Sequence, residues 1–298
     1  MLLRVLGTAA GGGLPQWNCA CPGCSGARRH PQRARRHASL AVRADDARWY
    51  LVGATPDIGD QIASHPELHP GPGPRDTPVA GIVLTDAELD HTLGIARLRE
   101  ARALDVLATG PVRDALLDRL RLGDILGPYT GITWRPLPTR EPQPLVAGGP
   151  LEISAVPVSA KRPRYAAADA PAEDWVVALR LTDRATGGTL VYAPALAAWP
   201  DALQRAAAEA DCVIVDGTFW DDEEPRRAGF TERTSTAMGH LPIDGPNGTA
   251  RLLRTLDARC LYTHLNNTNP LGDPAAEEHK LLAEWGIEVA ADGMVIEL

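Results

Sequence analysis

The sequence predicts a layered α/β sandwich in which polar side chains collect where the strands end. Short apolar, β-branched runs of strand length alternate with helical segments, and they fall into two groups along the chain. Neither an internal repeat nor a low-complexity linker divides the 298 residues, and 44% hydrophobic content is enough for a sizeable core. We therefore expect one domain that spans residues 1–298.

The individual elements follow from apolar runs bounded by glycine, proline and polar residues. The expected strands are residues 2–6, 39–43, 48–52, 79–84, 105–109, 151–157, 175–182, 189–192, 212–215, 259–263, 287–289 and 294–297. The expected helices are residues 58–64, a helix that begins at residue 92, and residues 111–120, 200–209, 250–256 and 274–285. Residues 123–149 are rich in proline and glycine, and we assign no element there.

The composition argues against several classes of protein. A formal net charge of −8 does not favour nonspecific binding to nucleic acid. No apolar run is long enough to cross a bilayer. The N-terminal apolar run is interrupted by Arg4 and continues into glycine, which does not form a signal-peptide core. We therefore expect a cytoplasmic protein without a nucleic-acid or membrane partner.

Three of the five cysteines lie together in the segment NCACPGCSG. In a cytosolic chain, thiols spaced as Cys19, Cys21 and Cys24 are most of a tetrahedral zinc site. Zinc would also order the long loop at about 11–37, for which we expect no regular structure. Free or redox-active thiols are the alternative. His30 is the nearest candidate for a fourth ligand, but its arginine neighbours are equally typical of a surface residue.

A second cluster of metal-ligand residue types follows the expected strand 79–84. The segment TDAELDH places Asp86, Glu88, Asp90 and His91 within six residues, and its carboxylates repel one another unless water or a cation neutralises them. Carboxylate oxygen together with imidazole nitrogen suits a divalent transition metal better than calcium or magnesium. The alternative is a solvated acidic loop in which Asp90 caps the following helix.

Two distant strands end in further candidate ligands. The strand at 212–215 leads into Asp216 in VDGTFW, and the strand at 259–263 leads into His264 in YTHLNNTNP. In layered α/β folds, functional residues collect at this edge of the sheet. His240, in the loop segment MGHLP, could reach the same edge.

The chain resembles the coenzyme PQQ synthesis protein B family over essentially its whole length. The resemblance is carried by the segments GTAAGGGLPQWNCACPGC, TDAELDH, VDGTFW, MGH and HLNNTNP. It implies a four-layer αββα sandwich of the metallo-β-lactamase type, a structural Zn(II) on the three cysteines, and a role in building pyrroloquinoline quinone (PQQ). By analogy with related phosphodiesterases, Asn267, three residues after His264, is a candidate fourth zinc ligand.

The sequence departs from the binuclear hydrolases of the superfamily, which carry H-x-H-x-D-H in the acidic loop. Asp86 and Glu88 stand in place of two histidines that serve the first metal, and Ser159 stands where a third is usual. The ligand set that remains is Asp90, His91 and His264. Two imidazoles and one carboxylate are the ligands of non-haem Fe(II) oxygenases. The departures favour one catalytic Fe(II), and the resemblance implies iron-dependent hydroxylation of a cross-linked Glu-Tyr precursor.

On this hypothesis His240 is the candidate general acid or base, because an imidazole titrates near neutral pH. A loop histidine that only packs is the alternative. Asp216 could ligate the metal weakly, orient a water molecule or accept a phenolic proton. The small-molecule substrate, derived from a precursor peptide, carries several carboxylates that need cationic partners. Candidates for substrate binding are Arg162, Arg164, Arg233, Asp86 and Glu88, with Lys161 as a further cation.

The alternative for each cation, Lys161, Arg162, Arg164 or Arg233, is that it belongs to a solvated basic loop. Two main function classes stay open: an oxygenase that acts in cofactor synthesis, and a binding or carrier protein for PQQ or its precursor, with a role in transport. A zinc hydrolase is a third and weaker hypothesis. The sequence does not exclude a homodimer.

Overall fold

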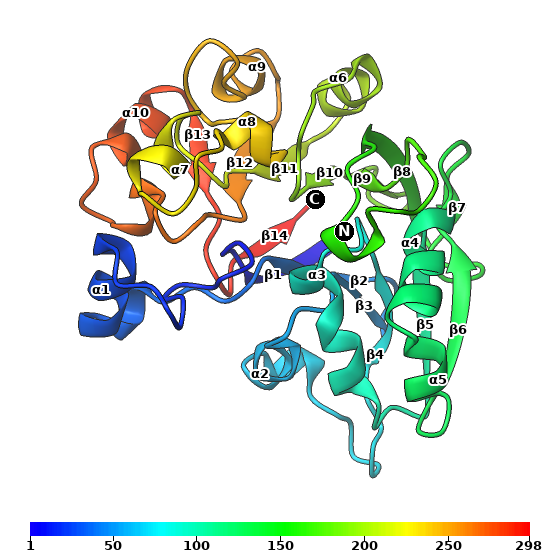
Figure 1. The fold of residues 1–298 in the computed structure, drawn as a ribbon. Helices are drawn as coiled ribbons and strands as arrows, with labels where there is room; N and C mark the ends of the chain where they lie inside the picture. The colour runs from blue at the N-terminus through cyan, green and yellow to red at the C-terminus, as the bar shows by residue number, and fades with distance from the viewer.

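The expected αββα sandwich is confirmed by the computed structural model, which describes residues 1–298. Two mixed sheets of seven strands each pack face to face, and helices cover their outer faces (Figure 1). Strand order is β14-β1-β2-β3-β4-β5-β6 in one sheet and β13-β12-β11-β10-β9-β8-β7 in the other. Each sheet is therefore antiparallel in one half and parallel in the other.

The first sheet contains both ends of the chain, since β1 pairs with β14 and the amide of Leu298 donates to the carbonyl of Met1 at 3.0 Å. Its strands are β1 (Leu2–Gly7), β2 (Ser39–Arg43), β3 (Trp49–Val52), β4 (Val79–Val83), β5 (Ala103–Ala108), β6 (Gly131–Pro136) and β14 (Val295–Glu297). Nearly all the expected strand positions are confirmed to within two residues. The segment 123–149, for which we expect no element, supplies β6, the two-residue strand β7 (Gln143–Pro144) and most of helix α5 (Leu122–Leu126).

The second sheet places three parallel strand ends next to one another. Its strands are β7 (Gln143–Pro144), β8 (Leu151–Ser159), β9 (Val176–Asp183), β10 (Thr189–Ala193), β11 (Cys212–Asp216), β12 (Arg259–Thr263) and β13 (Ile287–Val289). Strands β10, β11 and β12 run parallel, and the register pairs Asp216 with Thr263. Asp216 and His264 therefore emerge at the same edge of the sandwich.

Ten α-helices, several of them a single turn, lie outside the sheets. They are α1 (Pro22–Arg29), α2 (Ile58–Ala63), α3 (Leu89–Thr92), α4 (Gly110–Asp114), α5 (Leu122–Leu126), α6 (Asp201–Ala208), α7 (Glu224–Arg227), α8 (Ser235–Met238), α9 (Ala250–Leu253) and α10 (Glu278–Glu284). Helix α3 begins at Leu89, three residues before the expected start. Asp90 is therefore inside the first turn, and the N-cap position belongs to Glu88, so Asp90 is not the cap. None of these helices has the length and apolar character that a membrane span requires.

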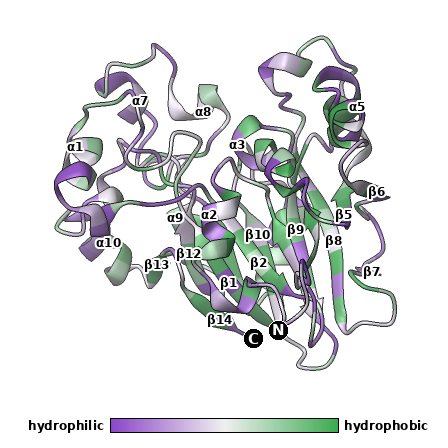
Figure 2. Cartoon of the chain, turned by 90° about the horizontal axis from the view of Figure 1, so that it is seen from below, coloured by the Kyte–Doolittle hydropathy of each residue, from purple (hydrophilic) through white to green (hydrophobic).

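The largest hydrophobic cluster lies between the two sheets. It joins residues such as Leu40 and Val52 of the first sheet to Leu179 and Ile214 of the second. Figure 2 shows these hydrophobic strands inside the sandwich, with hydrophilic residues on the outer helices α1, α7 and α10. Further clusters fill the space between each sheet and its helices. Central strands buried on both faces explain the continuous apolar runs of the sequence.

The loop at 11–37 contains a helix, contrary to our expectation of no regular structure. Helix α1 spans eight residues, Pro22–Arg29. The side chain of Cys21 caps its N-terminus by accepting from the amide of Cys24, and Pro22 occupies the first turn. Glycine, serine and cysteine have low helix propensity, which is why the composition hid this helix.

Candidate active site

A pocket of about 650 Å³ opens at the edge where β8, β11 and β12 end. This volume is in the range of small-molecule sites. The pocket wall brings together residues that the sequence places far apart: Asp86, Glu88, Asp90, His91, Lys161, Arg162, Arg164, Arg233, His240 and His264. Asp216 is completely buried and lies behind this wall.

Three candidate metal ligands converge in the pocket. The Oδ2 atom of Asp90 lies 3.4 Å from Nε2 of His264 and 3.8 Å from Nε2 of His91. Both Nε2 atoms are buried and have no hydrogen-bond partner within the protein. Buried polar atoms normally have a partner, so two unpartnered nitrogens beside a carboxylate need an explanation. A divalent cation bound by Asp90, His91 and His264 fits this donor set.

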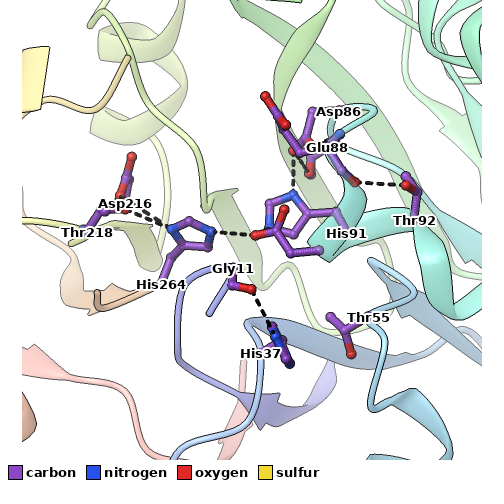
Figure 3. Close-up of polar contacts among 12 residues, drawn as sticks. Gly11, His37, Thr55, Asp86, Glu88, His91, Thr92, Asp216, Thr218 and His264 are labelled. Carbon is purple, nitrogen blue, oxygen red and sulfur yellow. Dashed lines mark hydrogen bonds and ion pairs between the residues drawn. The ribbon is translucent and has the colours of Figure 1, made fainter. Parts of the chain in front are cut away.

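Asp86 holds the ring of His91 from the side opposite the ligand atom (Figure 3). The Nδ1–H group of His91 donates to Oδ2 of Asp86 at 2.7 Å, which leaves Nε2 free to bind a metal. The same carboxylate accepts from the hydroxyl of Thr85 at 2.8 Å and the amide of Glu88 at 2.9 Å. Asp86, a candidate for substrate binding from the sequence, lines the pocket and is hydrogen-bonded to His91.

The carboxylates of Asp86 and Asp90 favour a positive charge on or beside His91. Burial would lower the pKa of His91, but the negative charges of Asp86 and Asp90 outweigh burial and raise it to about 10. Burial likewise opposes ionisation of Asp90, yet His91 and then His264 hold the pKa of that carboxyl far below its usual value. In the absence of a metal, a proton on His91 balances the carboxylates. A divalent cation would replace that proton.

His264 has an unusual backbone conformation, and its side chain lines the pocket. Its φ angle is +59°, in the left-handed region that non-glycine residues seldom adopt. The N-terminal segment holds this turn, because the amide of Leu265 donates to the carbonyl of Thr8 at 2.8 Å and the amide of Ala10 donates to the carbonyl of Leu265 at 2.9 Å. The N-terminal segment thus joins the two sheets at the ligand edge.

Asp216 orients His240 instead of facing the pocket. One carboxylate oxygen accepts from the amide of Thr218 at 2.9 Å and from its hydroxyl at 2.5 Å. The other accepts from the amide of Leu196 at 2.8 Å and from Nδ1 of His240 at 2.7 Å. Four donors occupy both oxygens, so a direct metal bond would require one of them to leave. The arrangement instead leaves Nε2 as the unbonded ring nitrogen of His240, on the pocket wall.

The cationic side chains named from the sequence all belong to the pocket lining. Lys161, Arg162, Arg164 and Arg233 all line it, although they come from the loop after β8 and the segment before α8. The ammonium group of Lys161 lies 3.9 Å from the carboxylate of Glu88, and both side chains are about one third exposed. Burial and then the charge of Asp86 raise the pKa of Glu88. The four cations can meet a ligand that carries several carboxylates.

Two features of the pocket were not foreseen. The hydroxyl of Tyr165 donates to the carbonyl of Ala87 at 2.5 Å, which places its ring on the pocket wall. Gly11 allows the N-terminal segment to approach the ligands, since a Cβ atom there would lie 3.0 Å from Oδ2 of Asp90. The ring of His37 contacts the carbonyl of Gly11 at 3.3 Å from the other side (Figure 3). Gly11 lies in the expected zinc loop, and its spacing in the sequence gives no sign of the contact with Asp90.

The three cysteines and Asn267 converge on a second potential metal site. The terminal amide nitrogen of Asn267 lies 3.1, 3.3 and 3.4 Å from the sulfur atoms of Cys19, Cys21 and Cys24. A rotation of the amide by 180° would place its oxygen at the same point. The sulfur atoms lie within 4.8 Å of one another. His30 is exposed and does not belong to this cluster.

Comparisons with known proteins agree with this architecture. A model of the beta-lactamase superfamily domain matches residues 48–264. Coenzyme PQQ synthesis protein B of Azoarcus sp. is 42% identical over 304 residues and covers 100% of both chains. The protein of that name from Cupriavidus necator is 42% identical over 304 residues and covers 99% of each chain.

Solved structures give the same result. The crystal structure of Zn(2+)-bound PqqB from Methylobacterium extorquens matches with a TM-score of 0.90 and 32% sequence identity, over 100% of both chains. A diphosphatase from the PhnP family matches with a TM-score of 0.70 at 19% identity, over 100% of this chain and 97% of that chain, and shares the fold alone. Full-length identity and a shared fold together establish that the chain belongs to the coenzyme PQQ synthesis protein B family.

Proposed function

We propose that the chain is a cytoplasmic enzyme of PQQ synthesis that uses Fe(II) and O₂ to hydroxylate the tyrosine ring of a cross-linked Glu-Tyr precursor. The observation that carries the proposal is the donor set of the pocket. Two buried imidazole nitrogens without a partner face one carboxylate, from His91, His264 and Asp90. This is the ligand type of non-haem Fe(II) oxygenases.

The other side chains of the loop support one metal rather than two. Asp86 and Glu88 stand in place of two histidines of the binuclear hydrolases, and Ser159 stands in place of a third. The carboxylate of Asp86 is hydrogen-bonded to His91, and the carboxylate of Glu88 lies 3.9 Å from the ammonium group of Lys161. These residues therefore lack the imidazole donors that a second zinc would require. The crystal structure of PqqB from Methylobacterium extorquens is of the Zn(2+)-bound protein, which supports metal binding in the family. We also propose a structural Zn(II) at Cys19, Cys21, Cys24 and Asn267.

The protein groups have separate roles on this proposal. Bound Fe(II) would supply activation of O₂ next to the phenol ring. The unbonded Nε2 of His240 accepts the phenolic proton, and the buried carboxylate of Asp216 stabilises the resulting imidazolium. Conversion of an aromatic C–H to C–OH by O₂, with release of water, consumes two electrons and two protons. The chain has no flavin or nicotinamide fingerprint, so for this hydroxylation the electrons come from an external reductant; where the phenol itself supplies them, the product is the corresponding ortho-quinone and water.

The pocket suits a small, acidic substrate. Four cationic side chains line a volume of about 650 Å³: Lys161, Arg162, Arg164 and Arg233. Arginine binds carboxylates with two parallel hydrogen bonds, so these residues can orient a precursor that carries several carboxylates. The ring to be hydroxylated would then lie in the same pocket as the donor atoms of His91 and His264.

The test is anaerobic loading with Fe(II), followed by oxygen uptake with and without the cross-linked precursor. We expect uptake only with substrate, and under ¹⁸O₂ we expect label on the ring carbon next to the phenolic oxygen. Label that arrives only from water would indicate hydration or hydrolysis. Tight binding of the precursor or of PQQ without oxygen uptake, with every metal and reductant tried, would support the carrier function instead. His91→Ala, which removes a ligand, is the matched control.

A further inference from the structure

The hydroxyl of Thr218 contacts Asp216 and the imidazoles of His240 and His264. It follows β11 and lines the pocket, although only 3% of the residue is exposed. Its hydroxyl oxygen lies 2.5 Å from Oδ1 of Asp216, 2.8 Å from Nδ1 of His264 and 3.1 Å from Nδ1 of His240. Figure 3 shows Thr218 and Asp216 on the side of the His264 ring that faces away from His91.

The number of protons fixes the direction of these hydrogen bonds. A threonine hydroxyl has one proton to donate, and an ionised carboxylate can only accept. Both oxygens of Asp216 accept from backbone amides, which can only donate: Oδ1 from Thr218 at 2.9 Å and Oδ2 from Leu196 at 2.8 Å. The Thr218 proton therefore goes to Asp216, and the Thr218 oxygen must accept from His264. Since His240 donates its own Nδ1–H to Asp216 at 2.7 Å, His264 is the main donor to Thr218.

We infer that Thr218 is a positioning residue that sets the affinity of the metal site through His264. By accepting from Nδ1–H, Thr218 selects the tautomer in which Nε2 carries the lone pair, and it also fixes the ring orientation. The partner of a ligating histidine is usually a carboxylate, a backbone carbonyl or water, and its loss weakens metal binding about 10- to 100-fold. The inference rests on the proposed metal site but not on hydroxylation.

The test measures metal binding, with the full-length protein and the cysteine site already loaded with zinc. Co(II) is titrated and followed by its visible absorption in the unsubstituted protein and in Thr218→Val, which keeps the shape of the side chain but not its hydroxyl. We expect about 10- to 100-fold weaker Co(II) binding. Thr218→Ser, which restores the hydroxyl, should return the affinity to within about threefold of the unsubstituted value.

Thr249→Val is the matched control for the loss of a buried hydroxyl. Thr249 is fully buried and bonds to the hydroxyl of Tyr262 at 2.9 Å, with no contact to the site imidazoles. This variant should bind Co(II) like the unsubstituted protein. Should Thr218→Val fail to fold, as judged by its melting curve, Thr218→Ala tests the same loss without a branched side chain.

The possible failures are distinguishable. Equal Co(II) affinity in Thr218→Val and in the unsubstituted protein would overturn this inference alone. Weak binding in Thr218→Ser, as weak as in Thr218→Val, would show that side-chain volume and not the hydroxyl matters, and would also overturn it. If the unsubstituted protein binds Co(II) no better than His91→Ala, the proposed metal site fails and this inference fails with it.

Discussion

Replacement of Asp86 by alanine tests whether Asp86 orients the candidate ligand His91 instead of binding the metal itself. The carboxylate accepts from Nδ1 of His91 at 2.7 Å, and both side chains are buried. Its removal leaves the Nδ1–H group without an acceptor and frees the ring to rotate. A buried donor left unsatisfied costs about 1–3 kcal/mol. Because about 1.4 kcal/mol corresponds to a tenfold change, this cost predicts metal binding roughly 5- to 150-fold weaker.

This range overlaps the 10- to 100-fold losses of affinity that follow removal of a histidine's partner in metal sites generally. We therefore expect Asp86→Ala to bind Fe(II) with a measurable but lower affinity, and His91→Ala to lose binding at this site. Competition with a chromophoric chelator under anaerobic conditions measures both affinities. The zinc content of the cysteine site, determined separately, should not change.

Glu88→Ala is the matched control from the same loop. The carboxylate of Glu88 lies 3.9 Å from Lys161 and makes no hydrogen bond to a ligand imidazole. Its loss should leave metal affinity unchanged and alter only substrate affinity or rate. Metal loss in Asp86→Ala as complete as in His91→Ala would refute the division between ligand and positioning residue. Unchanged affinity in Asp86→Ala would refute the role of the Asp86–His91 hydrogen bond.

Four further predictions concern the two metal sites and the acid–base group. Cys21→Ser should release zinc and lower the melting temperature; a full zinc content with an unchanged melting curve would contradict a zinc site. Metal binding near pH 7.5 should release a proton, because the pKa of His91 is raised to about 10 by nearby carboxylates despite burial, and calorimetry in buffers of different ionisation enthalpy detects it. The raised pKa of His91 also means that its protonation stabilises the metal-free protein fully below about pH 6.5, and this stabilisation should be lost towards pH 10. A melting temperature of the metal-free protein that does not change with pH over this range would contradict this prediction. His240→Gln should retain metal yet hydroxylate at least about 100-fold more slowly, whereas full activity would leave His240 a packing residue.

The sequence was sufficient for most strands of the two sheets and for the edge at which the candidate site residues lie. Strands such as Ser39–Arg43 and Arg259–Thr263 are β-branched or apolar runs with clear polar boundaries, and the structure confirms them. Metal-ligand residue types at the ends of two such strands identified the edge, because parallel strands bring their carboxyl ends together. By contrast, helix α1 was hidden by residues of low helix propensity, and it depends on the cap supplied by Cys21.

The assignment of individual roles needed contacts that no spacing in the sequence encodes. From the sequence, Asp216 and Asp86 could each bind metal or substrate directly. In the structure, Asp216 is hydrogen-bonded to His240 and Asp86 is hydrogen-bonded to His91. The motif VDGTFW contains Thr218, but its bond to His264 crosses 46 positions of the chain. The same limit applies to Gly11, whose contact with Asp90 depends on how the N-terminal segment crosses between the sheets.

The three imidazoles of the candidate site share one pattern, which is consistent with the proposal that one metal site remains after the loss of two superfamily histidines. His91 is held by Asp86, His240 by Asp216, and His264 by Thr218, each through its Nδ1 atom. In every case the Nε2 atom is the one left for the pocket. On this proposal, the aspartate that replaces the first histidine of the loop is not merely a lost ligand, because it holds His91, a candidate ligand of the remaining site. Restoring histidine at position 86 would remove that support while adding a donor, and we expect such a variant to bind the remaining metal more weakly.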